Sequence, residues 1–186
     1  MHGVQRSIRW LGGALPGLGL VFLVSGLAQA STIPLGDVLP PLRGELLSGR
    51  RIVLPDSALG SGTLLLLGFT YESRHDVEAW AERFLHDFGS DSLLRCYEIP
   101  VGGAARLARP FIDGGMRRGT PREFHERVIT VYRGAAEWKR HVGFSERDVA
   151  YVLLVDRQGR VVWLARGPFG EAAYGALAGR VRELPH

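Results

Sequence analysis

The stretch from Thr63 to Trp80, TLLLLGFTYESRHDVEAW, places an apolar run directly before a polar loop and an amphipathic segment. Residues 64–69 are continuously apolar over the length of one strand, which is typical of a strand buried on both faces of a sheet. From residue 75 to residue 88 the apolar residues recur at helical spacing, as Val77, Trp80, Ala81, Phe84, Leu85 and Phe88. The pattern predicts a central strand, a loop and a helix with one apolar face.

The residues that flank this helix indicate its ends and the next element. Ser73 is a candidate for the capping residue before the helix, and Gly89 is a candidate for the position where the helix ends. Residues 93–101, LLRCYEIPV, predict a second strand. A strand, a helix and a strand in this order form a βαβ unit.

Outside this unit, glycines at 44 and 49 predict a short hairpin within residues 42–55. Residues 151–156 and 160–165 predict two strands joined by a tight turn, and residues 170–184 predict a final helix. The expected buried face of that helix comprises Ala173, Tyr174, Leu177 and Val181. The middle of the chain is expected to contain a helical turn at 104–108, a turn at 113–115, a helix at 121–127, a strand at 128–132 and a short helix at 135–141.

Residues 1–30 have the pattern of a secretory signal peptide. Two arginines, Arg6 and Arg9, precede an apolar run at 10–27, and Ala28-Gln29-Ala30 supplies the small residues that signal peptidase accepts. We therefore expect export, cleavage after residue 30, and a periplasmic or other extracytoplasmic location. The alternative is an uncleaved segment that anchors the protein in the inner membrane.

Charge gives no indication of a nucleic-acid partner. The chain has 23 Lys and Arg against 19 Asp and Glu, and removal of Arg6 and Arg9 with the signal peptide leaves 21 against 19. An excess of two positive charges is too small to predict binding to a polyanion.

The order of the expected elements resembles the thioredoxin fold. The hairpin YVLLVDRQGRVVW, residues 151–163, is similar to an element of thioredoxin-like oxidoreductases, Sco proteins and peroxiredoxins. The resemblance implies a three-layer α/β/α sandwich with a central mixed sheet. It divides the chain into a signal peptide at 1–30, an N-terminal extension with a short hairpin at 31–62, and a thioredoxin-like domain at 63–186.

The residues that carry redox chemistry in such proteins are absent from this sequence. Their reactive cysteine lies where the first core helix begins, and the matching residues 71–76 contain no thiol. Their proline before the hairpin is matched by Asp148-Val149-Ala150. The only cysteine, Cys96, lies in an apolar strand, so we expect it to pack in the core. We expect no catalytic residue, no resident metal and no small-molecule cofactor.

A narrower resemblance connects the chain to the mitochondrial ATP synthase assembly factor ten family. It rests on residues 52–55, Ser73, Trp80, His125, Arg127, Tyr132, Trp138, 151–156, 159–163 and Gly167. Val162 departs from that family, in which a basic residue is commoner. The resemblance implies a non-redox factor that binds or helps to assemble an envelope or membrane protein complex. The alternatives are a redox protein that uses Cys96, and a weak metal site around His75 with Glu72 and Asp76.

The loop between the first strand and helix is the expected binding surface. Free N–H groups at a helix start and the carboxyl end of a strand are common features of ligand sites in α/β proteins. The candidate residues are Tyr71, Glu72, Ser73, Arg74 and His75, with contributions from Val149 and the turn Gly167-Pro168. The alternative is a solvated loop without a binding role.

Overall fold

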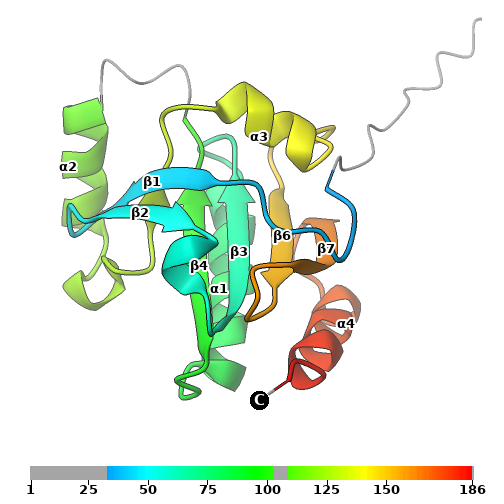
Figure 1. Cartoon of the computed structure of the whole chain (residues 1–186). Coiled ribbons are helices and arrows are strands. Elements are labelled where there is room, and N and C mark those ends of the chain that lie inside the picture. Colours follow the sequence, from blue (N-terminus) through cyan, green and yellow to red (C-terminus); the bar gives the residue numbers. More distant parts are fainter. Residues whose placement is uncertain (1–32, 103–108, 186) are drawn as a thin grey trace, which may run out of the picture.

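A mixed four-stranded sheet forms the centre of the protein. The computed structural model describes residues 33–102 and 109–185 (Figure 1). The strand order is β4-β3-β6-β7, in which β3 is parallel to β4 and antiparallel to β6, and β6 is antiparallel to β7. The strands are β3 Gly62–Gly68, β4 Leu94–Pro100, β6 Ala150–Val155 and β7 Val161–Gly167. This arrangement confirms the predicted fold class, including the parallel βαβ unit and the C-terminal hairpin.

The apolar run that predicted the central strand is buried on both faces, as expected. Leu64 and Leu66 pack toward one side of the sheet, and Leu65 and Leu67 pack toward the other. All four side chains are fully buried, because successive residues of a strand point to opposite faces and both faces are covered.

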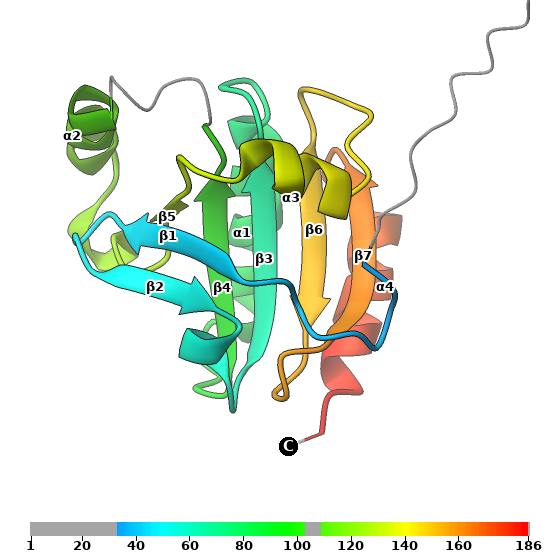
Figure 2. The same ribbon diagram turned by 45° about the horizontal axis from the view of Figure 1, so that its top comes forward.

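One layer consists of the helices α1 Arg74–Phe88 and α4 Glu171–Arg182 (Figure 2). In α1 the predicted stripe is confirmed, because its buried residues are Val77, Trp80, Ala81 and Phe84, with Leu85 and Phe88 partly buried. In α4 the prediction for Ala173 is wrong, since this residue is exposed. The buried face follows the spacing i, i+3, i+4, i+7 through Tyr174, Leu177, Ala178 and Val181.

The other layer combines a small sheet with a short helix. The strands β1 Leu42–Leu46 and β2 Arg51–Leu54 form the predicted hairpin, and β5 Ile129–Thr130 pairs with the other edge of β1. The predicted helix α3 Ala135–His141 covers the end of the central sheet beside them (Figure 2). Leu42, Leu54 and Leu65 belong to one core cluster, so the N-terminal hairpin shares its core with the central sheet. The predicted boundary between an N-terminal extension at 31–62 and a thioredoxin-like domain at 63–186 stays a prediction.

The middle of the chain differs from the sequence-based expectation. The turn expected at 113–115 is wrong, because these residues lie inside the helix α2 Arg109–Gly119. Asp113 is buried, and its Oδ1 accepts a hydrogen bond of 2.7 Å from the Tyr132 hydroxyl. The helix expected at 121–127 is only the 3₁₀ turn η3 Arg122–Phe124. Beside β5, Val128 forms an isolated parallel bridge to Glu98 of β4, and Val131 forms one to Val101, directly after β4. The helical turn expected at 104–108 lies outside the described residues.

Candidate functional site

The candidate site lies where β3 ends and α1 begins, beside the loop that leads into β6. Figure 2 shows this end of the sheet at the top, where α3 crosses in front of it. It is the end at which the carboxyl termini of the parallel strands β3 and β4 meet, and such ends are common ligand sites in open α/β sheets. Within the described residues no helix is both long enough and apolar enough to cross a membrane.

Ser73 has a structural role at this position. Its side chain is fully buried, and its Oγ donates a hydrogen bond to the Thr70 carbonyl at 2.8 Å. Its backbone N–H donates to Thr70 Oγ1 at 3.2 Å, and the Thr70 N–H donates to Ser73 Oγ at 3.2 Å. Ser73 immediately precedes the helix, as predicted, but its hydroxyl makes no capping hydrogen bond to it. Ser73 was one of the predicted contact residues. This part of the prediction is corrected, because its hydroxyl is buried inside the turn and is not accessible to a partner.

A glycine in β3 makes this enclosed turn possible. A Cβ atom at Gly68 would lie 2.7 Å from Ser73 Oγ, well inside van der Waals contact. The loop therefore folds back directly onto the end of the central strand, and the serine hydroxyl lies where a larger side chain at position 68 would have to be.

Two carboxylates connect the start of α1 to the residues before β6. Thr70 Oγ1 donates to Asp148 Oδ1 at 2.9 Å. Asp76 accepts a hydrogen bond from the Ala150 N–H. The pKa of the Asp76 carboxyl group is raised, because the effect of its burial outweighs the lowering effects of His75 and of this hydrogen bond. The bond between Val149 and Ala150 is trans. The redox proteins that the chain resembles would have a proline and a substrate groove next to this position. Here, hydrogen bonds between the start of α1 and residues 148–150 are found instead.

The other predicted contact residues are accessible. The Tyr71 side chain is 73% exposed, the largest fraction among the exposed large apolar residues, and Glu72 and His75 are exposed as well. The Arg74 guanidinium lies 3.7 Å from the centre of the Tyr71 ring, and its Nη1 donates to the Tyr71 carbonyl at 3.1 Å. This stacking holds the two side chains together at the surface.

The two auxiliary segments also lie at this end of the sheet. Gly167 pairs with Ala150 across β6 and β7, so Val149 and Pro168 belong to adjoining segments. The Gly167 carbonyl accepts a hydrogen bond of 3.4 Å from Trp80 Nε1, and Val149 is half-buried. Pro168 is exposed. The structure therefore brings together all the predicted segments and leaves Ser73 inside.

An aromatic cluster, not expected from the sequence, lies next to this loop. Phe69 contacts Phe144 and Tyr151 edge-on, with ring centres 5.1 and 5.5 Å apart. The Lys139 ammonium lies 4.3 Å from the centre of the Phe144 ring. Phe69, Phe144 and Lys139 are only partly buried, so they extend the candidate surface toward α3. The available signal was the position of Phe69 directly before the polar loop.

Cys96 packs in the core, as predicted. It lies in β4 opposite Leu64, 6% of its surface is exposed, and it belongs to the cluster between the sheet and the α1 and α4 helices. Burial raises the pKa of its thiol far above the ordinary range, so the reactive thiolate is suppressed. Position and ionisation both oppose a nucleophilic role for this cysteine.

We expect Cys96→Ala to lower the free energy of unfolding by about 1–2 kcal/mol, because it removes one small apolar contact. Urea denaturation of both proteins measures this difference. The native wild-type thiol should resist a thiol reagent and react once the protein is unfolded. Rapid labelling of the native protein would contradict the buried assignment.

The alternative metal site around His75 gains no further ligands. Across residues 33–102 and 109–185, no three His, Cys, Asp or Glu side chains gather at metal-binding distance. Asp76 is the nearest carboxylate in sequence, and it is engaged with the Ala150 N–H.

The fold has many structural relatives, although no family model and no curated protein matches the sequence. The thioredoxin domain of a thiol-disulfide oxidoreductase from Bacteroides vulgatus is similar with a TM-score of 0.53 and 15% identity, over 81% of this chain and 99% of that one. A peroxiredoxin-like protein from Aquifex aeolicus gives a TM-score of 0.55 and 13% identity, over 82% and 88%.

BsSco, a member of the Sco family of cytochrome c oxidase assembly proteins, gives a TM-score of 0.54 at 14% identity, with 81% of this chain and 95% of that chain covered. At such identities the similarity establishes the fold, and the activity has to be inferred from the residues themselves. The chain has a thioredoxin-like fold with a single, buried cysteine.

Proposed function

We propose that this protein is an exported, non-redox member of the thioredoxin-like superfamily that binds or helps to assemble an envelope or membrane protein complex. The observation that carries the proposal is the enclosed turn of Thr70 and Ser73, whose hydrogen bonds satisfy one another at the start of α1, where the resemblance implies the redox thiol of related proteins. The assembly role of a structurally similar Sco protein supports the same class of function. An ATP synthase-like complex is the more specific partner that we propose from the sequence resemblance.

The proposed contact surface is formed by Tyr71, Glu72, Arg74 and His75, and the aromatic cluster beside them. The stacked pair of Tyr71 and Arg74 offers an aromatic face and a cation that are held in place before binding. A rigid pair loses little conformational freedom when it contacts a partner, which favours reversible binding without covalent chemistry. Such a surface needs no cofactor and fits a protein segment rather than a nucleic acid.

The test is recovery of partners from solubilised membranes with the triple variant Tyr71→Ala, Arg74→Ala, His75→Ala. We expect it to fold normally and to lose the wild-type partners, because the stacked pair and the imidazole are removed together. The matched control is Arg43→Ala, Arg51→Ala, Glu123→Ala, which removes three exposed side chains from other surfaces. Equal recovery by the triple variant and the wild type would exclude the loop as the binding surface.

Export is tested separately by the intact mass of the protein from its host. We expect the chain to begin at Ser31, because the cleavage pattern ends at Ala30. A full-length species in the membrane fraction would replace this prediction with the anchored alternative.

A further inference from the structure

Residues 71–75, here called the Tyr71 loop, lie at one end of the central sheet. The opposite end of the sheet displays several exposed apolar side chains. Among the described residues, the exposed large apolar side chains are Leu35, Val38, Leu59, Tyr71 and Leu93. Leu59 and Leu93 lie in the connections that precede β3 and β4, and Val38 bridges Arg160 at the start of β7. These side chains are 55%, 39% and 52% exposed, respectively.

Backbone hydrogen bonds join these connections into one surface. The Gly60 N–H donates to the Arg157 carbonyl at 2.9 Å, and the Gly62 N–H donates to the Leu93 carbonyl at 2.9 Å. The Leu39 N–H donates to the Gly159 carbonyl at 2.8 Å. The apolar side chains are therefore presented by a fixed platform of loops.

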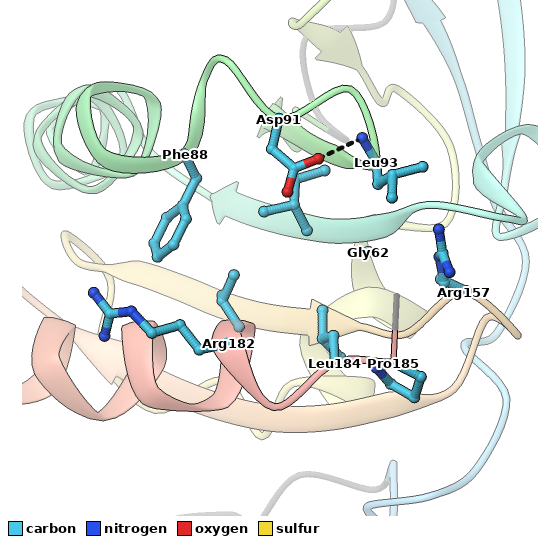
Figure 3. A pocket seen from close by; sticks show the side chains of 10 residues that line it. Gly62, Phe88, Asp91, Leu93, Arg157, Arg182, Leu184 and Pro185 are labelled. Atoms are coloured by element: carbon cyan, nitrogen blue, oxygen red, sulfur yellow. Dashed lines mark hydrogen bonds between the residues drawn. The ribbon is translucent and has the colours of Figure 1, made fainter.

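An apolar pocket of about 120 Å³ opens within this surface (Figure 3). Figure 3 shows Phe88 and Leu184 at the pocket, with Arg157 on one side and Arg182 on the other. Pockets for small-molecule ligands usually measure about 300–1,000 Å³. This one is too small to enclose such a ligand and suits a single apolar chain end.

The two arginines at the pocket are available for an anion. Within the described part of the chain, neither Arg157 nor Arg182 has an ion-pair partner, and Arg182 lies over the Phe88 ring at 5.7 Å. Of the nearby acidic groups, Asp91 also lines the pocket and its carboxylate accepts the Leu93 N–H at 2.8 Å, while Glu183 pairs with Arg180. Asp156 Oδ1 accepts the N–H groups of Gln158 and Arg160.

We propose that this end of the molecule docks on a bilayer that contains anionic phospholipid. Apolar side chains at loop tips insert among acyl chains, while arginines beside them reach the phosphate groups. Each arginine near an anionic surface contributes about 1 kcal/mol. The proposal does not rest on the partner-binding function of the Tyr71 loop, which lies at the other end of the sheet.

The length of the preceding chain supports a lipid as the occupant. The apolar run at 10–27 is separated from Ile33 only by residues 28–32, and five residues span at most about 17 Å. Residues 34–41, which lead into β1, are hydrogen-bonded to the end of the sheet that we propose docks on the bilayer, since the Gly36 N–H donates to the Val161 carbonyl at 2.8 Å. Until signal peptidase acts, the run therefore keeps residues 34–41 within reach of the membrane, and the vesicle experiment on the chain from Ser31 measures the affinity that is left once this tether is gone.

The experiment measures co-sedimentation of the chain from Ser31 with vesicles of phosphatidylcholine, with and without phosphatidylglycerol. This form contains the whole described fold. We expect binding to the anionic vesicles only, weakened about tenfold or more in Arg157→Gln, Arg182→Gln. Leu59→Ser, Leu93→Ser should weaken binding comparably. The control is Arg43→Gln, Arg51→Gln, which removes two exposed arginines from the N-terminal hairpin and should bind as the wild type does.

Three results would overturn the proposal. They are the absence of binding to anionic vesicles, an equal loss in the Arg43→Gln, Arg51→Gln control, and binding that the leucine and arginine variants retain. Size-exclusion chromatography provides a further arm: a concentration-dependent dimer that the leucine variant abolishes would assign the surface to a second copy of the chain. Circular dichroism of each variant establishes that it is folded, and a failed vesicle test leaves the recovery of protein partners unaffected.

Discussion

Trp80→Ala is expected to lower the free energy of unfolding by about 3–5 kcal/mol. Trp80 is 1% exposed and lies between the central sheet and α4. Its ring is 5.6 Å from Phe169 and 6.3 Å from both Trp163 and Tyr174, measured between ring centres. Alanine would leave a cavity among three aromatic rings that the surrounding helices cannot readily close. Urea denaturation followed by circular dichroism measures the loss.

The matched control for this change is Glu82→Ala, two residues along the same helix. Glu82 is exposed, so its replacement should change the free energy of unfolding by less than about 0.5 kcal/mol. A loss below about 1 kcal/mol for Trp80→Ala would show that α1 does not depend on this contact for its attachment to the sheet.

Stability is expected to fall as the pH rises from about 5 to 8, and Glu98→Gln should remove much of this fall. Glu98 lies in β4 and is partly buried, and burial raises the pKa of its carboxyl group to about 7 from an ordinary value of 4.5. The neighbouring Glu78 raises this pKa as well, while Arg127 lowers it.

The sign follows from the protons bound in each state. Below pH 4.5 Glu98 is protonated in both the folded and the unfolded chain. Between pH 4.5 and about 7 the folded chain retains this proton more than the unfolded chain does, so the free energy of unfolding falls as the pH rises. Above about pH 7 Glu98 is ionised in both states, and the free energy of unfolding falls no further on its account. The full shift corresponds to a loss of about 3 kcal/mol.

Urea unfolding at pH 5 and pH 8 tests this expectation, with the wild type compared with Glu98→Gln. The pKa of Asp76 is also raised. Because both proteins contain Asp76, its contribution to the pH dependence of stability cancels when they are compared. Glu78→Gln is the graded control, because removal of that charge should lower the pKa of Glu98 and reduce the fall only in part. Parallel curves for the wild type and Glu98→Gln would contradict the assignment.

The central strand and first helix could be predicted because their patterns are local. Leu64 to Leu67 are apolar without interruption, and the stripe that contains Trp80 repeats at helical spacing, so either pattern is readable without knowledge of the fold. The helix α2 could not be read in this way. Gly114 and Gly115 predict a turn, and the contact that buries Asp113 comes from Tyr132, which only the folded chain brings near.

The candidate site was predictable in position and only partly in detail. The sequence placed the loop correctly because a polar segment separates a buried strand from an amphipathic helix. It could not show that Ser73 is enclosed, since this depends on the close approach of the loop to Gly68. Phe144 was missed because it joins Phe69 from a segment 75 residues away along the chain.

The bridges between β5 and β4 have a consequence for behaviour at high concentration. An unpaired outer strand is a template on which a second molecule can add its own strand and begin a fibre. Here the Glu98 N–H donates to the Arg127 carbonyl and the Gly102 N–H donates to the Val131 carbonyl, each at 2.9 Å, so the carboxyl end of this edge is already occupied. Addition of a second molecule's strand is thereby opposed at the carboxyl end of β4, where the chain itself supplies the neighbouring segment.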